Sequence, residues 1–263
     1  VNEAALLARK DVFRFRHLDP GSLAELLKRR LPATGRPLVL TDGVFAATGA
    51  IAPLPDYLEV LAPYEGASVV VDDAHGIAVL GERGRGTLEW YGLWDAKVNQ
   101  TLSCRGIGLF MGGTLSKAMG GYGGIIPATP GLLSALGATA HYYDGASAPA
   151  SPIAAATAKA IEIVMAEPEL RTRLSNNILK MRQGLRALGV EATDEPSANI
   201  GLQIGSGTNM KRVHEGLKAE AILVPYLSAY SGVHPEGLLR VAVCAAHTPE
   251  MIDALLSALA RIL

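Results

Sequence analysis

Lys117 lies within a glycine-rich stretch, MGGTLSKAMGGYGG, which spans residues 111 to 124 and contains a threonine at position 114. Glycine lets the backbone come close to a ligand. Backbone amides and a hydroxyl at the end of a strand can bind a phosphate, and the amine of Lys117 is then within reach of whatever carries that phosphate. A lysine in a glycine-rich turn is also often a solvated loop residue, so Lys117 alone leaves both interpretations open.

A second polar segment, VDDAHG at residues 71 to 76, contains Asp72 and His75. The acid could cap a helix and the histidine could be structural when each is taken alone. Together with Lys117 they form a set, because a lysine imine, an aspartate for a ring nitrogen and a histidine for a ring oxygen are what pyridoxal phosphate (PLP) needs to act as an electron sink. A buried carboxylate at Asp72 would hold the ring nitrogen protonated. The three residues therefore predict a PLP site.

Three short apolar runs position these residues: PLVLTDG at 38 to 44, SVVVDDAHG at 68 to 76 and IGLFMGGTLSK at 107 to 117. Each run is typical of a strand that passes directly into polar or glycine residues, and the runs alternate with helical patterns, which favours a parallel sheet. Ligands of such sheets collect beyond the carboxyl ends of the strands, so we expect the three ends to meet at one crevice. GGIIPATP at 123 to 130 predicts a fourth short strand.

From about Ser151 the pattern changes to helix, with Ser151-Pro152 as a helix start. Leucines, isoleucine and methionine recur every three or four residues from 170 to 188 and stop at Gly189. Strands are expected at 198 to 205, 221 to 227 and 238 to 245, a helix near 208 to 219, and a closing helix capped by Thr248. We therefore predict two domains, 1–150 as part of a large sheet domain and 151–263 as a small α+β domain, with long connecting helices near 151–188.

The composition favours an enzyme of small molecules. With 263 residues, 49% apolar content and a formal net charge of -1, the chain has no electrostatic signature for nucleic acid or an anionic membrane. No apolar stretch reaches the ~20 residues of a membrane span, and no signal-peptide pattern is present, so we expect a cytoplasmic protein. Cys104 and Cys244 are too few and too far apart in the sequence to indicate a disulfide framework. The His-Tyr-Tyr-Asp run at residues 141 to 144 could suggest a metal cluster, but adjacent side chains of a strand or helix point apart, so no metal site is predicted.

Four segments carry a resemblance to a known family: TDGVFAATG, VVVDDAHGIAVLGERGRGT, GGTLSKAMGGYGG and GLLRVAVCAAHTPEMID. In order and spacing they resemble the α-oxoamine synthases, whose members include 8-amino-7-oxononanoate synthase and 2-amino-3-ketobutyrate CoA ligase. The resemblance covers nearly the whole chain. It implies an α/β protein of the fold type I PLP-dependent transferases, with a mostly parallel sheet in the large domain and a smaller α+β C-terminal domain.

The resemblance also implies roles for individual residues. Lys117 matches the Schiff-base lysine, Asp72 the partner of the pyridine nitrogen, His75 the residue near the phenolic oxygen, and Thr114 a phosphate contact. Ser147 lies where one protomer of the family reaches the phosphate of the other.

Arg240, in LLRVAV, matches the arginine that binds the amino-acid carboxylate. A strand arginine suits a bidentate carboxylate contact, although a surface salt bridge is the alternative.

The implied activity is a PLP-dependent acyl transfer that condenses an amino acid with an acyl-CoA and releases carbon dioxide and coenzyme A, in a homodimer with shared active sites. Two alternatives stay open, a PLP-dependent aminotransferase and a truncated, non-catalytic dimerising subunit. The family carries a long segment before the point where this chain starts, with a glycine-rich phosphate loop and a histidine that stacks on the ring. We therefore expect the chain to be the carboxyl-terminal two-thirds of such an enzyme, with a pocket that lacks a wall; the sequence does not identify the amino acid or acyl group.

Overall fold

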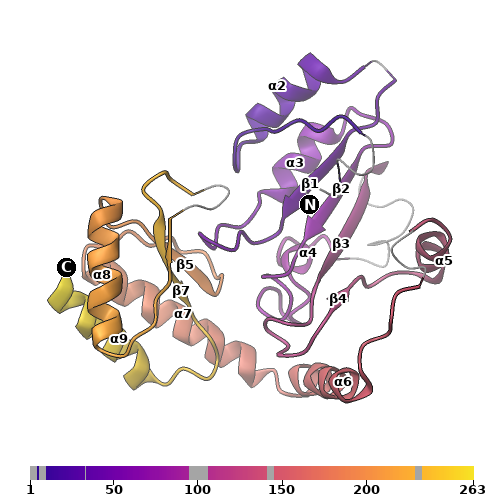
Figure 1. Cartoon of the computed structure of the whole chain (residues 1–263). Helices are drawn as coiled ribbons and strands as arrows, with labels where there is room; N and C mark the ends of the chain where they lie inside the picture. Colours follow the sequence, from indigo (N-terminus) through magenta and orange to yellow (C-terminus); the bar gives the residue numbers. More distant parts are fainter. Residues whose placement is uncertain (1–4, 6–9, 33, 95–105, 141–144, 229–232) are drawn as a thin grey trace.

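The computed structural model describes residues 5, 10–32, 34–94, 106–140, 145–228 and 233–263 (Figure 1). Its first sheet has the order β1-β2-β3-β4, formed by β1 (Leu38–Asp42), β2 (Ser68–Asp72), β3 (Gly108–Thr114) and β4 (Gly124–Ile125). The first three strands are parallel, and β4 is antiparallel to β3. The predicted α/β class with a parallel sheet is confirmed. The fourth strand is shorter than predicted, because Thr129 caps a helix that begins at Pro130.

Side chains that alternate along the strands build the core of this sheet. Successive strand residues point to opposite faces, so every second one can be buried. They pack in one cluster with side chains of α2 (Pro20–Arg30), α3 (Leu54–Leu61) and α4 (Thr87–Trp90). The strand members of the cluster are Val39, Val69, Val71, Leu109 and Met111. This packing fixes the carboxyl ends of the strands, where the candidate residues lie.

The other face of the sheet is more open. Leu38 is 58% exposed, and a hollow of about 510 Å³ is lined by residues that include Leu40, Val70, Gly112 and Ile126. Parallel sheets usually have both faces covered. Asp72, the exposed last residue of β2, lies at the edge of this open face.

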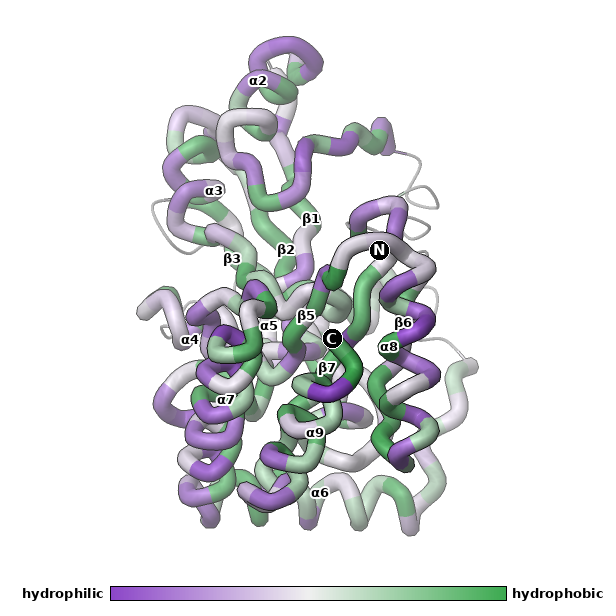
Figure 2. Tube along the Cα trace, turned by 90° about the vertical axis from the view of Figure 1, so that its left-hand side faces the viewer, coloured by the Kyte–Doolittle hydropathy of each residue, from purple (hydrophilic) through white to green (hydrophobic). Residues whose placement is uncertain are grey.

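The second sheet is antiparallel, with the order β5-β7-β6. It consists of β5 (Asn199–Leu202), β6 (Tyr226–Leu227) and β7 (Leu238–Ala242), and it packs with α7 (Glu169–Ala187), α8 (Gly207–Ala219) and α9 (Pro249–Ile262). Hydrophilic and hydrophobic stretches alternate along these helices (Figure 2), as expected when only one helix face is buried. The buried members of the two larger apolar clusters come from different parts of the chain, 23–111 and 174–259. The division at residue 150 stays a prediction.

Most helix ends follow the sequence signals. α5 (Pro130–Thr139) and α6 (Ser151–Ala166) both begin at a proline-containing turn, and the Thr248 side chain accepts a hydrogen bond from the backbone of Met251 at the start of α9. The predicted face of α7 is buried at Leu174, Ile178, Met181 and Leu185, and Gly189 ends it with φ 74°. These sequence signals are therefore confirmed.

The strand predicted at 221 to 227 is wrong for its first five residues. Ala221, with φ 61°, and Ile222 donate backbone hydrogen bonds to Lys218 and Leu217 and so close the end of α8. Only Tyr226–Leu227 is left to pair with β7. Within the described residues, no helix is both long and apolar enough to cross a membrane.

Candidate active site

The loop that follows β3 forms a closed turn around Lys117. The amide of Leu115 donates to the carbonyl of Gly123 at 2.9 Å, and the amide of Gly121 donates back to Leu115 at 2.7 Å. Inside this turn the amide of Gly120 donates to the carbonyl of Lys117 at 3.0 Å, with φ 61° at Gly120. A positive φ is easy only for glycine. The glycines thus form the turn that presents the lysine.

Thr157, a buried residue of α6, is hydrogen-bonded to this turn. Its hydroxyl accepts a hydrogen bond from the amide of Tyr122 at 3.2 Å and donates to the carbonyl of Ile153 at 2.8 Å. A Cβ atom at Gly121 would lie 2.5 Å from that hydroxyl, so the glycine allows the close approach. Sequence analysis missed Thr157; its only signal is a hydroxyl within an otherwise apolar turn of the helix.

The structure brings Lys117 and His75 together. The Nζ atom of Lys117 lies 2.8 Å from Nε2 of His75. Asp72, three residues before His75, ends β2 and accepts a hydrogen bond from the amide of Ala74 at 3.1 Å. In the sheet, Asp72 is paired with Gly112 of β3, at the start of the Lys117 stretch. The predicted convergence of strand ends is confirmed for β2 and β3.

The surroundings of His75 lower its pKa to about 4. Burial is the largest cause, since it disfavours the charged imidazolium. The charges of Lys117 and Arg240 act in the same direction, and the charge of Asp72 opposes them. His75 is therefore a neutral imidazole near pH 7, with one hydrogen-bond donor and one acceptor.

Asn199 is a site residue that sequence analysis missed. Its Nδ2 atom lies 3.0 Å from Nδ1 of His75, on the side of the ring away from Lys117. Asn199 begins β5 in the second sheet and is only 7% exposed. A polar residue at the start of a short apolar strand gives no hint of a partner 124 positions away.

Arg240 also comes from the second sheet, where it lies on β7 opposite Gly201. Its charge lowers the pKa of His75, which puts the guanidinium within electrostatic range of the site. The Nε atom of Arg240 is buried and has no hydrogen-bond partner among the described residues. Arg240 is half-buried, and a guanidinium is suited to bind an anion such as a carboxylate.

The two remaining candidates stand apart. The hydroxyl of Thr114 donates to the carbonyl of Gly123 at 3.1 Å and lies 2.7 Å from the hydroxyl of Ser116, so it stabilises the lysine turn. Ser147 lies in the exposed stretch between α5 and α6. In the described part of the chain, no hydrogen bond joins Ser147 to the other five candidates.

Asp73, next to Asp72, has a different role. It is fully buried, and both of its carboxylate oxygens accept hydrogen bonds of 2.6 Å from Thr87, one from the amide and one from the hydroxyl. Burial raises the pKa of Asp73 to about 6, against the lowering effect of those hydrogen bonds. Cβ atoms at Gly43, Gly76 and Gly86 would lie 2.3, 2.0 and 1.9 Å from this carboxylate. Asp73 therefore links three turns around the site.

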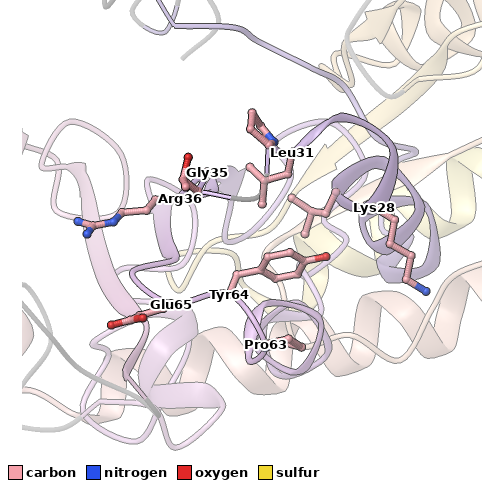
Figure 3. A pocket seen from close by; sticks show the side chains of 10 residues that line it. Lys28, Leu31, Gly35, Arg36, Pro63, Tyr64 and Glu65 are labelled. Atoms are coloured by element: carbon pink, nitrogen blue, oxygen red, sulfur yellow. The ribbon is translucent and has the colours of Figure 1, made fainter.

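Several other predicted features lie elsewhere. Cys104 and residues 141 to 144 are outside the described residues, and Cys244 is an exposed free thiol. No group of histidine, cysteine and acidic residues in the described segments could hold a metal ion. A second hollow of about 510 Å³, lined in part by Lys28, Arg36 and Tyr64 (Figure 3), contains none of the six candidate residues.

Comparison with known proteins identifies the family of the chain. Residues 1–259 match the family model of aminotransferase class I and II. The chain belongs to this family. The 8-amino-7-oxononanoate synthase of Thioalkalivibrio sulfidiphilus is 36% identical over 259 residues, which is 98% of this chain and 63% of that protein. The resemblance to α-oxoamine synthases is thereby confirmed, and the chain spans about 63% of the length of this relative.

Solved structures show the same fold. Serine palmitoyltransferase of Sphingomonas wittichii has a TM-score of 0.86 and 29% identity, covering 99% of this chain and 63% of that one. A high-resolution structure of SPT with a PLP internal aldimine has a TM-score of 0.84 and 28% identity, covering 96% and 61%. The predicted fold class, that of the fold type I PLP-dependent transferases, is confirmed.

Proposed function

We propose that this chain carries the lysine-bearing part of a PLP-dependent C-acyltransferase, which condenses an amino acid with an acyl-CoA and releases carbon dioxide and coenzyme A. The observation that carries the proposal is the 2.8 Å contact between Nζ of Lys117 and Nε2 of His75 at the ends of neighbouring parallel strands. Asp72 belongs to the same strand end. An amine, an imidazole and a carboxylate meet where α/β sheets bind their ligands.

The residues present fit PLP. Lys117 supplies an amine for the aldehyde, Asp72 an exposed carboxylate for the ring nitrogen, and His75 a neutral imidazole for the ring oxygen. Thr114 offers a hydroxyl to the phosphate, which would replace its local contact with Ser116. When bound, PLP supplies an electron sink for the electron pair left at the α-carbon of the amino acid after a bond to that carbon breaks.

The chain's own residues supply binding and proton transfer. Arg240 would bind the carboxylate of the amino acid through its guanidinium, and so set which bond to the α-carbon is broken. The Nζ atom of Lys117, as a free amine, would accept the α-proton. His75 stays uncharged near pH 7 and keeps one N–H to offer. The partners we propose are an amino acid, an acyl-CoA and a second protomer that contributes Ser147; a cytoplasmic location belongs to the same proposal.

Borohydride trapping tests the assignment of the lysine. The chain is mixed with one equivalent of PLP, reduced, digested and mapped by mass spectrometry, and we expect the adduct on Lys117. The Lys117→Met variant should lose it. Lys159→Met is the matched control, because Lys159 is an exposed residue of α6 paired with Glu162. An adduct on another lysine in the parent chain, or none, would contradict the proposal; the absence of any adduct favours a non-catalytic dimerising subunit.

Product analysis distinguishes the proposed acyl transfer from the second candidate, an aminotransferase, the activity for which the matching family model is named. The PLP-loaded chain is incubated with glycine or alanine and an acyl-CoA. Release of free coenzyme A and carbon dioxide in equal amounts supports the acyl transfer. An oxo acid formed from the amino acid, with the acyl-CoA unchanged, supports transamination instead.

A further inference from the structure

The imidazole of His75 is contacted on both of its nitrogens by different parts of the chain. Lys117 lies at Nε2, and Asn199 lies at Nδ1. The first contact comes from the turn after β3, and the second from the start of β5 in the other sheet. The function proposed above gives the contact at Nδ1 no role.

Asn199 is held in place by bonds that do not involve its side chain. Its carbonyl accepts hydrogen bonds from Arg182 at 3.3 Å and from the hydroxyl of Ser197 at 3.2 Å, and it pairs with Ala242 of β7. A residue fixed in this way can present its amide at a set position. The side chain of Asn199 is thus free to serve His75.

We propose that Asn199 is a positioning residue, whose Nδ2–H donates a hydrogen bond to Nδ1 of His75 and so fixes the imidazole as the tautomer with its hydrogen on Nε2, on the side of Lys117. A neutral imidazole has one N–H, so an outside donor at Nδ1 leaves that hydrogen on Nε2. A charged Lys117 would be a second donor, at Nε2, so the assignment applies where that ammonium is absent, as when the amine holds PLP or is replaced by methionine. The tautomer itself does not depend on the proposed function. Only the role of this N–H, as a donor to the ring oxygen of PLP, rests on that function.

The charges around the ring agree with a neutral His75. Lys117 and Arg240 disfavour the imidazolium, burial does the same, and the charge of Asp72 opposes them. Because the net effect lowers the pKa, the imidazole does not take a second proton near pH 7. An amide is a suitable partner under these conditions, since it holds the tautomer without adding the charge that a carboxylate would bring.

NMR of the imidazole nitrogens tests the proposal without PLP. The ¹⁵N shifts of His75 are measured in the Lys117→Met chain, where Asn199 is the remaining neighbour of the ring, and His75 is assigned by its absence in a His75→Gln chain. We expect the hydrogen on Nε2. In a Lys117→Met chain that also carries Asn199→Asp, the hydrogen should move to Nδ1, because a carboxylate accepts where the amide donated. The pKa of His75 should rise by about 1 pH unit or more.

Two further variants keep the test decisive. Asn199→Leu removes the donor while filling similar space, and should give a mixture of both tautomers. Asn209→Asp, the same chemical change at the start of α8, should leave His75 unchanged. A hydrogen on Nδ1 in the starting chain, or no response to either change at position 199, would overturn the proposal. Neither result affects the lysine-labelling experiment, so the two failures are distinguishable.

Discussion

At the scale of single residues, the site combines exposed groups with one constrained group. Lys117 and Asp72 are exposed, whereas His75 is partly buried and hydrogen-bonded on both ring nitrogens. An exposed amine and carboxylate can be reached by a ligand. A constrained imidazole keeps its orientation and its charge state when the ligand changes. The arrangement leaves binding to the exposed residues and orientation to the constrained one.

The lowered pKa of His75 makes a prediction for stability. The pKa is about 4 in the folded chain against an ordinary 6.5, so as pH falls from 6.5 toward 4 the unfolded chain takes up the proton first. Folding stability is therefore lost over that range. The His75→Gln variant lacks this titration. From pH 7 to pH 5 its unfolding free energy should therefore fall by about 1 kcal/mol less than that of the parent, after allowance for partial exposure. Urea unfolding at both pH values measures it; a difference between the two chains that does not change with pH would contradict the prediction.

Arg240 gives a second prediction at this scale. Its charge contributes to the lowered pKa of His75, so Arg240→Met should raise that pKa. Arg240→Lys retains the charge and should keep the pKa close to the parent value. An NMR titration of His75 in the three chains compares them, and equal pKa values in the parent and the Met variant would place the guanidinium out of range of the ring.

At the scale of elements, Asp73 holds the turns that carry the candidate residues. Its carboxylate bonds Thr87 at the start of α4, and it lies against Gly43 after β1 and Gly76 after β2. A buried carboxylate costs free energy unless its oxygens are satisfied. Its raised pKa reflects that cost, and the hydrogen bonds from Thr87 partly offset it.

Glycine substitutions test this arrangement. A methyl group at Gly86 would lie 1.9 Å from the Asp73 carboxylate, at a residue with φ 91°. We expect Gly86→Ala to lower the unfolding free energy by about 2–4 kcal/mol, through the clash and the strained backbone. Gly137→Ala in α5, where nothing lies within 4 Å, should be neutral or stabilise by up to about 1 kcal/mol. Thermal unfolding compares the two, and equal effects would mean that the turns do not depend on close contact with Asp73.

The sequence predicted well those features that depend on neighbours along the chain. Strand ends at Asp72 and Thr114, the cap at Thr248 and the buried face of α7 follow from local periodicity and end signals. The contacts of Thr157 and Asn199 could not be predicted, because each depends on a partner that is distant in the chain. The strand expected from 221 to 227 failed for a related reason: its apolar residues include the turn that ends α8.

At the scale of the whole molecule, the site combines residues of both sheets, which Figure 1 draws in separate parts of the molecule. Besides the bond between His75 and Asn199, the amide of Gly201 in β5 donates to the carbonyl of Thr48 at 3.2 Å. A Cβ atom at Gly49 would lie 1.9 Å from the carbonyl of Asn199, so the loop after β1 packs tightly on β5. The second sheet thereby contributes Asn199 and Arg240 to a site whose lysine and acid come from the first.

Arg182 of α7 fixes the segment that makes this contact. It is 3% exposed and donates to the carbonyls of Thr193, Ser197 and Asn199. Burial lowers the pKa of Arg182, which shows that the guanidinium gives up hydration to make these bonds. Removing it would take this donor from the buried carbonyl of Ser197, whereas the carbonyl of Asn199 would keep the hydroxyl of Ser197.

The last prediction therefore compares two arginines one helical turn apart. Arg182→Met should lower the unfolding free energy by about 2–4 kcal/mol, because it takes a donor from the buried carbonyls of Ser197 and Asn199 and loosens the segment that carries Asn199. Arg186→Met is the matched control: Arg186 pairs with the exposed Asp194 at the surface, so its loss should cost less than about 1 kcal/mol. Urea unfolding gives both values, and the NMR signal of His75 should move only in the first variant. Equal costs, or an unchanged His75 in the Arg182 variant, would mean that the second sheet meets the site without depending on this arginine.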